Sequence, residues 1–232
     1  MKYLKNIKTN YREYIIEFTG TTILVFFAAG SVMVSSLIAN PSGMIVCGVV
    51  SGLTLMMLIW SFGDKSGAHF NPALTLTLTL FGEFPSERLF GYVLCQMAGS
   101  AVAASILYCT LGMVGDMGAN MPNVELGMSW VSTLAIETGL SLIMMLIIKG
   151  SNFTNIQFQK LSSIPIGAIV GIEVMLMGPI AGAAMNPARA FGPYLYYGKW
   201  HFFGIYFIGP LVGLLCGAYL WKIIEHPVFL KK

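Results

Sequence analysis

Residues 66–75 read SGAHFNPALT and residues 178–193 read GPIAGAAMNPARAFGP, and the two segments share the pattern Gly-Ala-x-x-Asn-Pro-Ala. Each is preceded, at a similar distance upstream, by a glutamate in an apolar stretch: Glu17 in the first half of the chain and Glu137 in the second. The same order of features therefore occurs twice, which indicates an internal repeat.

The shared Asn-Pro-Ala triplet is a helix-start signal, because Asn is a preferred N-cap and Pro is favoured at the first helical position. The cap uses the side-chain oxygen of Asn, which leaves its amide nitrogen pointing outward as a donor, and Ala lets two helix starts approach closely. The apolar segments that follow, Pro72–Phe81 and Pro187–Tyr197, would each reach about 15 Å, half of the ~30 Å hydrocarbon core. We predict two half-helices that meet in the membrane. The triplets are Asn71, Pro72 and Ala73, and Asn186, Pro187 and Ala188.

Composition places the remainder of the chain in a membrane. Of 232 residues, 56% are hydrophobic and 10% are charged, whereas soluble domains carry about 25% charged residues. Six apolar stretches are long enough to cross a bilayer. We place them near Tyr14–Leu37, Met44–Phe62, Leu89–Leu111, Trp130–Ile148, Leu161–Met177 and Phe202–Ile224.

Each half contains three of these spans, so the second half must enter the membrane from the opposite face, as in the inverted repeats of many transport folds. With both termini on one side, eleven Lys and Arg residues lie on that side, and only Arg189 and Lys199 lie on the other. Basic residues accumulate on the cytoplasmic side, so we predict that both termini are cytoplasmic. The net charge of +3 reflects this topology and gives no indication of nucleic-acid binding.

The residue pattern argues against an enzyme. Nucleophilic catalysis needs a nucleophile with a base in reach, and of the three histidines only His69 approaches the predicted core. No Cys-x-x-Cys motif or metal-ligand spacing occurs, so we expect no catalytic residue, no cofactor and no metal. A coupled secondary transporter, which also uses inverted repeats, is the remaining alternative; its only candidate coupling groups are Glu17 and Glu137.

The chain resembles the major intrinsic proteins, the aquaporins and glycerol facilitators, from about Tyr11 to Glu225, on the two quoted segments, the early glutamates and Gly209-Pro210. The resemblance implies the aquaporin fold, an all-α membrane protein of six transmembrane helices and two re-entrant half-helices in an inverted repeat. It implies one channel domain over residues 1–232, with repeats at about 11–111 and 130–225. It also implies a homotetramer with one pore in each protomer.

The resemblance further implies roles for three buried polar residues. The family counterparts of Glu17 and Glu137 accept hydrogen bonds from the backbone of the re-entrant loops, which must be satisfied inside a membrane. That structural role is favoured over a proton relay. His69 matches a family histidine near the cytoplasmic half of the pore, where it supports the loop or lines the pore.

In the family, four positions form a constriction that selects solutes. Counting from the two asparagines, they correspond here to Ser51, Val174, Ala183 and Arg189. Strict water channels typically place Phe, His and Cys or Thr beside the Arg, and glycerol facilitators place two aromatics there; this sequence has neither set. Val, Ala and Arg are most similar to the nodulin-like intrinsic proteins of plants and their bacterial relatives. Glu173, next to Val174, has no role in this scheme.

The sequence thus predicts a passive channel for water and small uncharged solutes, excluding protons and ions. A filter of small side chains predicts a wide pore, for which glycerol, urea and neutral metalloid hydroxides such as arsenous or boric acid are candidates. A water-selective aquaporin with an unusual filter is the alternative. We expect a multi-pass protein of a cytoplasmic membrane, and the short termini favour a prokaryotic source.

Overall fold

The computed structural model describes residues 2–151 and 160–225, and these residues form helices and connecting loops without any strand. Lys231 and Lys232, which contributed to the predicted orientation, lie outside the described residues. The α-helices are α1 (Lys2–Leu37), α2 (Gly43–Ser66), α3 (Pro72–Leu80), α4 (Ser86–Leu111), α5 (Trp130–Gly150), α6 (Ser163–Ala181), α7 (Pro187–Tyr197) and α8 (Phe203–Glu225). Short 3₁₀ turns, η1 (Gly115–Gly118), η2 (Val124–Leu126) and η4 (Trp200–Phe202), lie in the loops.

Six of these helices are long and apolar enough to cross a membrane, with spans of 28, 24, 26, 21, 22 and 26 residues. The six predicted spans are confirmed, and so are the two half-helices, α3 with nine residues and α7 with eleven. The first helix begins earlier than predicted, and its backbone breaks at Asn10 (φ −120°, ψ 17°), where the membrane span starts.

The fifth span ends later than predicted, because α6 continues through Gly178 and Pro179 to Ala181. Gly and Pro normally end a helix, but in membranes neighbouring groups can satisfy the backbone that a proline frees. A proline frees the carbonyl four residues before it, whereas Asn123 satisfies two carbonyls at the C-terminal end of α6, which lack helical partners because the helix stops there. The Asn123 side chain donates to the carbonyl of Pro179 (3.0 Å), and its backbone N–H donates to the carbonyl of Ile180 (3.0 Å).

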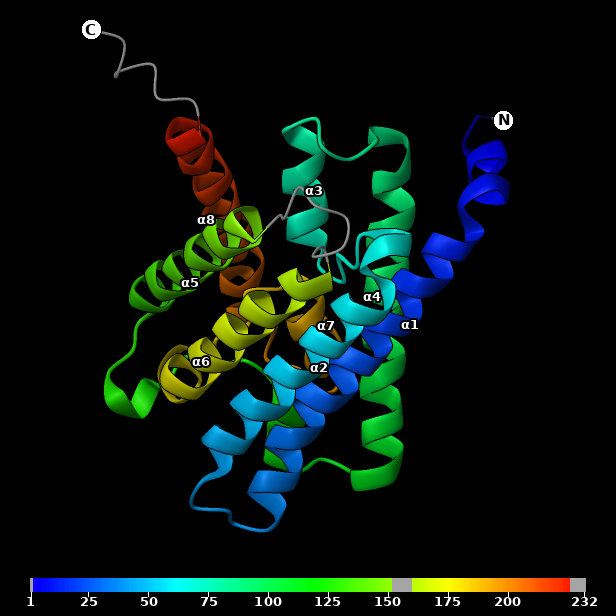
Figure 1. Cartoon of the computed structure of the whole chain (residues 1–232). Helices are drawn as coiled ribbons and strands as arrows, with labels where there is room; N and C mark the ends of the chain where they lie inside the picture. Colours follow the sequence, from blue (N-terminus) through cyan, green and yellow to red (C-terminus); the bar gives the residue numbers. More distant parts are fainter. Residues whose placement is uncertain (1, 152–159, 226–232) are drawn as a thin grey trace, which may run out of the picture.

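The two halves use the same helix pairs. In the first half α1 packs against α2 and α4, and in the second half α5 packs against α6 and α8. The six long helices form a ring around the half-helices α3 and α7. Each half-helix contacts both α4 and α8. Figure 1 shows the start of α1 and the end of α8 on the same side of the molecule as the C-terminal end of α3.

The halves join most closely where α2 crosses α6, because glycines bring the two backbones together. A Cβ added to Gly52 would lie 2.6 Å from the carbonyl oxygen of Gly167, and a Cβ on Gly167 would lie 2.6 Å from that of Gly52. Gly48 and Gly171 continue the contact along the same faces. Small residues at such crossings let membrane helices pack through van der Waals contact, so this seam admits no larger side chain.

We predict that Gly52→Ala or Gly167→Ala lowers the stability of the folded protein by about 1–3 kcal/mol, the usual cost of overpacking. Gly139→Ala on α5 is the matched control, since a Cβ there meets nothing within 4 Å. Thermal unfolding in detergent, followed by loss of the folded peak in size-exclusion chromatography, measures the effect. Equal behaviour of all three variants would contradict the close crossing.

Candidate functional site

Both Asn-Pro-Ala triplets start half-helices in the way that the sequence predicts. Asn71 caps α3, and its side-chain oxygen accepts hydrogen bonds from the backbone N–H groups of Ala73 (3.0 Å) and Leu74 (3.3 Å). Asn186 caps α7 and accepts from Ala188 (2.9 Å) and Arg189 (3.4 Å). The backbone at the two caps is nearly identical, with φ and ψ of −148° and 113° at Asn71 and −152° and 113° at Asn186.

The two turns are also bonded to each other. The Asn71 amide nitrogen donates to the carbonyl of Met185 (2.9 Å), and the Asn186 amide nitrogen donates to the carbonyl of Phe70 (2.8 Å). The sequence predicts that both amide nitrogens point outward as donors. In the structure each nitrogen already donates one hydrogen bond to the other turn. An amide NH₂ has two hydrogens; one is used across the junction, which leaves one for a further acceptor, and both asparagines line the cavity described below.

The loops before the two asparagines have matching backbones. Left-handed residues occur at the same three places of each motif: Gly67 (φ 85°), Ala68 (49°) and Phe70 (47°), and Gly182 (90°), Ala183 (48°) and Met185 (52°). Positive φ is unusual for residues other than glycine, and each such residue costs of order 1–3 kcal/mol unless its surroundings hold it there. The loops must therefore be held by contacts from outside.

Glu17 supplies those contacts to the first loop. One carboxylate oxygen accepts from the backbone N–H of His69 (3.0 Å) and the hydroxyl of Ser66 (2.8 Å). The other accepts from the backbone N–H of Phe70 (2.7 Å) and the side-chain amide of Gln96 (2.8 Å). The carboxylate is fully buried, and its four donors offset the cost of burying it.

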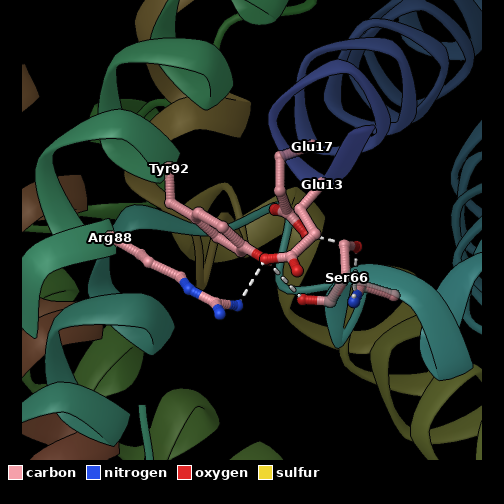
Figure 2. Close-up of polar contacts among 6 residues, drawn as sticks. Glu13, Glu17, Ser66, Arg88 and Tyr92 are labelled. Atoms are coloured by element: carbon pink, nitrogen blue, oxygen red, sulfur yellow. Dashed lines mark hydrogen bonds and ion pairs between the residues drawn. The ribbon is translucent and has the colours of Figure 1, made fainter. Parts of the chain in front are cut away.

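A polar network behind Glu17 ties the end of α2 to α1 and α4, as Figure 2 shows. The Tyr92 hydroxyl lies 2.8 Å from the carbonyl oxygen of Ser66 and 3.1 Å from the Glu13 carboxylate. Glu13 in turn forms an ion pair with Arg88 (2.7 Å). Three elements thus converge on the loop that carries Asn71.

Glu137 supports the second loop at the equivalent positions. Its two oxygens accept from the backbone N–H groups of Ala184 and Met185, both at 2.9 Å. Glu173 on α6 lies within electrostatic reach of Glu137 but differs from it in bonding. It is buried, and neither carboxylate oxygen has a hydrogen-bond partner among the described residues.

One cavity of about 540 Å³ is lined by part of the predicted site: Ser51, His69, Asn71, Val174, Ala183, Asn186 and Arg189. Pro72, Ala73, Pro187 and Ala188 form the first turns of the half-helices and do not line it, and Glu17 and Glu137 lie behind the loops. It extends from Lys149 and Lys160, on either side of the α5–α6 connection, to Arg189, and both Asn71 and Asn186 line it. The four predicted filter positions come together from three helices and one loop: Ser51 on α2, Val174 on α6, Ala183 in the second re-entrant loop and Arg189 on α7. The structure therefore brings every one of them to the same cavity.

Arg189 is fixed by the loop between α4 and α5. Its Nη1 donates to the carbonyl oxygen of Gly118 at 2.7 Å. Gly118 has a positive φ of 64° and packs so closely on α1 that a Cβ would lie 2.9 Å from the Cα of Ala29. Only glycine fits both requirements, so the orientation of the guanidinium depends on this glycine.

The sequence analysis did not identify the side chains that hold the second re-entrant loop near Arg189. The Asn120 amide donates to the carbonyl of Gly182 (2.7 Å), and the backbone carbonyl of Asn120 accepts from the Tyr194 hydroxyl (2.8 Å). The Tyr206 hydroxyl donates to the carbonyl of Ala181 (2.9 Å). A buried tyrosine needs a partner for its hydroxyl, which is a usable signal, but the sequence does not say which carbonyl it reaches.

His69 lines the cavity, and its Nδ1 lies 3.1 Å from the Thr75 hydroxyl. The ring also contacts Phe84 (centroids 4.9 Å apart) and Tyr92 (5.3 Å). In residues 2–151 and 160–225, no three His, Cys, Asp or Glu side chains gather as a metal site would require. The surroundings of His69 are those of a packed pore-lining side chain.

The sequence profile of the major intrinsic proteins matches residues 4–221, which covers nearly the whole chain. This chain belongs to the major intrinsic protein family. It is therefore an integral, multi-pass membrane channel of the aquaporin and aquaglyceroporin type, and it is not an enzyme.

Similar members of the family include plant proteins of the NIP type. Aquaporin NIP1-1 of Zea mays is 35% identical over 217 residues, covering 92% of this chain and 75% of that protein. Aquaporin NIP1-1 of Arabidopsis thaliana is 34% identical over 219 residues, covering 93% and 74%. These relatives agree with the predicted branch of the family, but they are plant proteins and do not support the expected prokaryotic source.

The fold is also found in a solved structure, the aquaglyceroporin from Plasmodium falciparum. The two superpose with a TM-score of 0.80 at 22% identity, covering 94% of this chain and 98% of that one. The likeness confirms the predicted aquaporin fold of this major intrinsic protein.

We predict that Glu137→Gln destabilises the channel much more than Glu173→Gln. The first change places an NH₂ group where a backbone N–H needs an acceptor, and an unpaired buried donor costs about 1–3 kcal/mol. The second is the same chemical change on a facing helix and removes no hydrogen bond to any described residue. Apparent melting temperatures in detergent compare the two, and an equal loss in both would contradict the assigned contacts of Glu137.

Proposed function

We propose that this chain is a passive channel for water and small uncharged solutes, with glycerol, urea and neutral metalloid hydroxides such as arsenous or boric acid as its solute class. The observation that carries the proposal is the cavity that joins both Asn-Pro-Ala turns to Ser51, Val174, Ala183 and Arg189. Three of these four side chains are small. A constriction lined by them leaves room for a solute larger than water.

The proposed filter has two chemically different sides. Arg189 offers guanidinium donors to the oxygen of a polar solute and opposes cations. Val174 and Ala183 provide an apolar wall, and Ser51 adds one hydroxyl. A neutral polyol, amide or hydroxide can bond to the first side and lay its apolar surface on the second, whereas an ion would lose hydration without adequate replacement.

Proton exclusion follows from the junction of the half-helices. The positive ends of α3 and α7 meet there, and each asparagine keeps one N–H for a further acceptor. A water oxygen bonded to both asparagines points its hydrogens away from the junction in both directions. The chain of waters that a proton needs is then interrupted, and Arg189 adds a further electrostatic barrier.

Assembly and orientation are part of the same proposal. We infer a single channel domain with cytoplasmic termini, in agreement with the eleven-to-two distribution of basic residues. The homotetramer with one pore in each protomer is inferred from membership of the family.

We predict that Ser51→Phe combined with Val174→His narrows the filter. Glycerol, urea and arsenite flux should fall about tenfold or more, equivalent to about 1.4 kcal/mol in the barrier, while part of the water flux remains. Stopped-flow light scattering on reconstituted vesicles measures all four. Ser51→Ala with Val174→Ala changes the same positions without adding bulk and should keep solute flux. If the native channel passes water alone, it is a water-selective aquaporin with an unusual lining.

We also predict that water permeates without protons. Vesicles loaded with a pH-sensitive dye should show fast osmotic water flow and no faster collapse of an imposed pH gradient than vesicles that lack the protein. A protonophore added afterwards serves as the positive control. Proton conductance that rises with the amount of reconstituted channel would refute the proposed orientation of water at Asn71 and Asn186.

A further inference from the structure

Within residues 2–151 and 160–225, neighbouring long helices pack directly against each other around the ring except at one seam, between α4 and α8. There the half-helices α3 and α7 provide most of the contact. In the described part of the chain, contacts run from α4 to α1, α1 to α2, α2 to α6, α6 to α5 and α5 to α8. Between α8 and α4, the contact passes through α3 and α7, each of which touches both. The α2–α6 seam on the other side of the inverted repeat is closed by glycines, so the two seams differ in kind.

A second cavity of about 370 Å³ lies in the α4–α8 seam. Its floor is formed by the first residues of the half-helices, among them Pro72 and Pro187. Its walls are apolar side chains such as Val93 on α4 and Leu211 on α8, and among the described residues that line it only Ser86 is polar. The second cavity therefore reaches the junction of the two half-helices from the side of the prolines, whereas the asparagines of the same junction line the first cavity.

The chemistry of the lining excludes water as a stable occupant, because a buried water needs two to four polar partners. The rim of the cavity is apolar as well: Phe90 is 70% exposed and Phe207 is 44% exposed on the outer surface of the helices. In a multi-pass membrane protein such a surface faces hydrocarbon. The medium that adjoins the opening therefore consists of lipid acyl chains.

The direction of the cavity fits a chain that descends from the interface. Ser86 is the first residue of α4, at the end of a membrane span, whereas the two prolines lie where the half-helices meet, about 15 Å deeper in a ~30 Å core. Pockets of roughly 300–1,000 Å³ hold small organic ligands, and this volume lies within that range.

We propose that the groove between α4 and α8 is a binding site for one lipid acyl chain, which enters beside Ser86 and reaches the backs of Pro72 and Pro187. The bound chain fills the seam that protein packing leaves open and braces the starts of both half-helices. The proposal is independent of which solute the pore carries.

Photolabelling in vesicles tests the site. The probe is a phosphatidylcholine with one 16-carbon acyl chain that ends in a diazirine, and labelled residues are mapped by mass spectrometry. A bound chain labels the partly buried groove residues Leu76, Val93 and Leu211 more heavily than their exposed neighbours Leu94 and Val212, which are 57% and 41% exposed. Labelling that simply follows exposure around the perimeter overturns the proposal.

Two neighbouring tryptophan variants sharpen the test. Val93→Trp fills the groove and should reduce labelling of Leu76 and Leu211 roughly tenfold, equivalent to about 1.4 kcal/mol in binding. Leu94→Trp adds the same side chain on the outer face and should leave that labelling unchanged. If Val93→Trp does not fold, the order of labelling in the native channel decides. Groove residues that stay unlabelled in the native channel, as when a second copy covers them, also overturn the proposal.

Discussion

The hydrogen bonds that the two Asn-Pro-Ala turns make with each other determine the centre of this channel. Each asparagine uses its oxygen to cap its own half-helix and one amide hydrogen to bond the carbonyl that precedes the other asparagine. Backbone groups inside hydrocarbon must be satisfied by protein, so both turns are possible only together. Glu17 and Glu137 accept hydrogen bonds from the left-handed loops that precede the two turns. These carboxylates lie on the membrane-spanning helices α1 and α5, which place them next to the loops.

The end of the cavity at Arg189 depends on a different kind of support. Arg189 and the second re-entrant loop are held by the segment between α4 and α5, through Gly118 and Asn120. This segment has little regular structure, yet its turn η1 contacts α1 and α7. Its contact with α6 includes the hydrogen bond that the Asn123 side chain donates to the carbonyl of Pro179. The residues of the proposed filter are therefore held in part by Gly118 and Asn120, which do not line the cavity themselves.

Much of this arrangement could be predicted from the sequence, because membrane spans and caps are local signals. Apolar length gives six helices, and Asn followed by Pro gives two helix starts with defined ends. Counting from Asn71 and Asn186 also brings Ser51 and Val174 to the cavity, since a helix fixes which face a residue occupies. What could not be predicted are pairings between distant loops, such as Asn120 with Gly182, and the extension of α6 past Pro179, where Asn123 bonds two carbonyls of the last turn.

The reciprocal bonds at the junction have a consequence for biogenesis. When the first three spans have been synthesised, Asn71 and Phe70 still lack the partners that they bond in the finished channel, because Met185 and Asn186 belong to the second half. The first re-entrant segment can therefore reach its final state only after α7 has been made and has entered from the other side. The junction is thus completed only when one half closes on the other, and a half-length chain has no complete pore of its own unless two copies supply both turns.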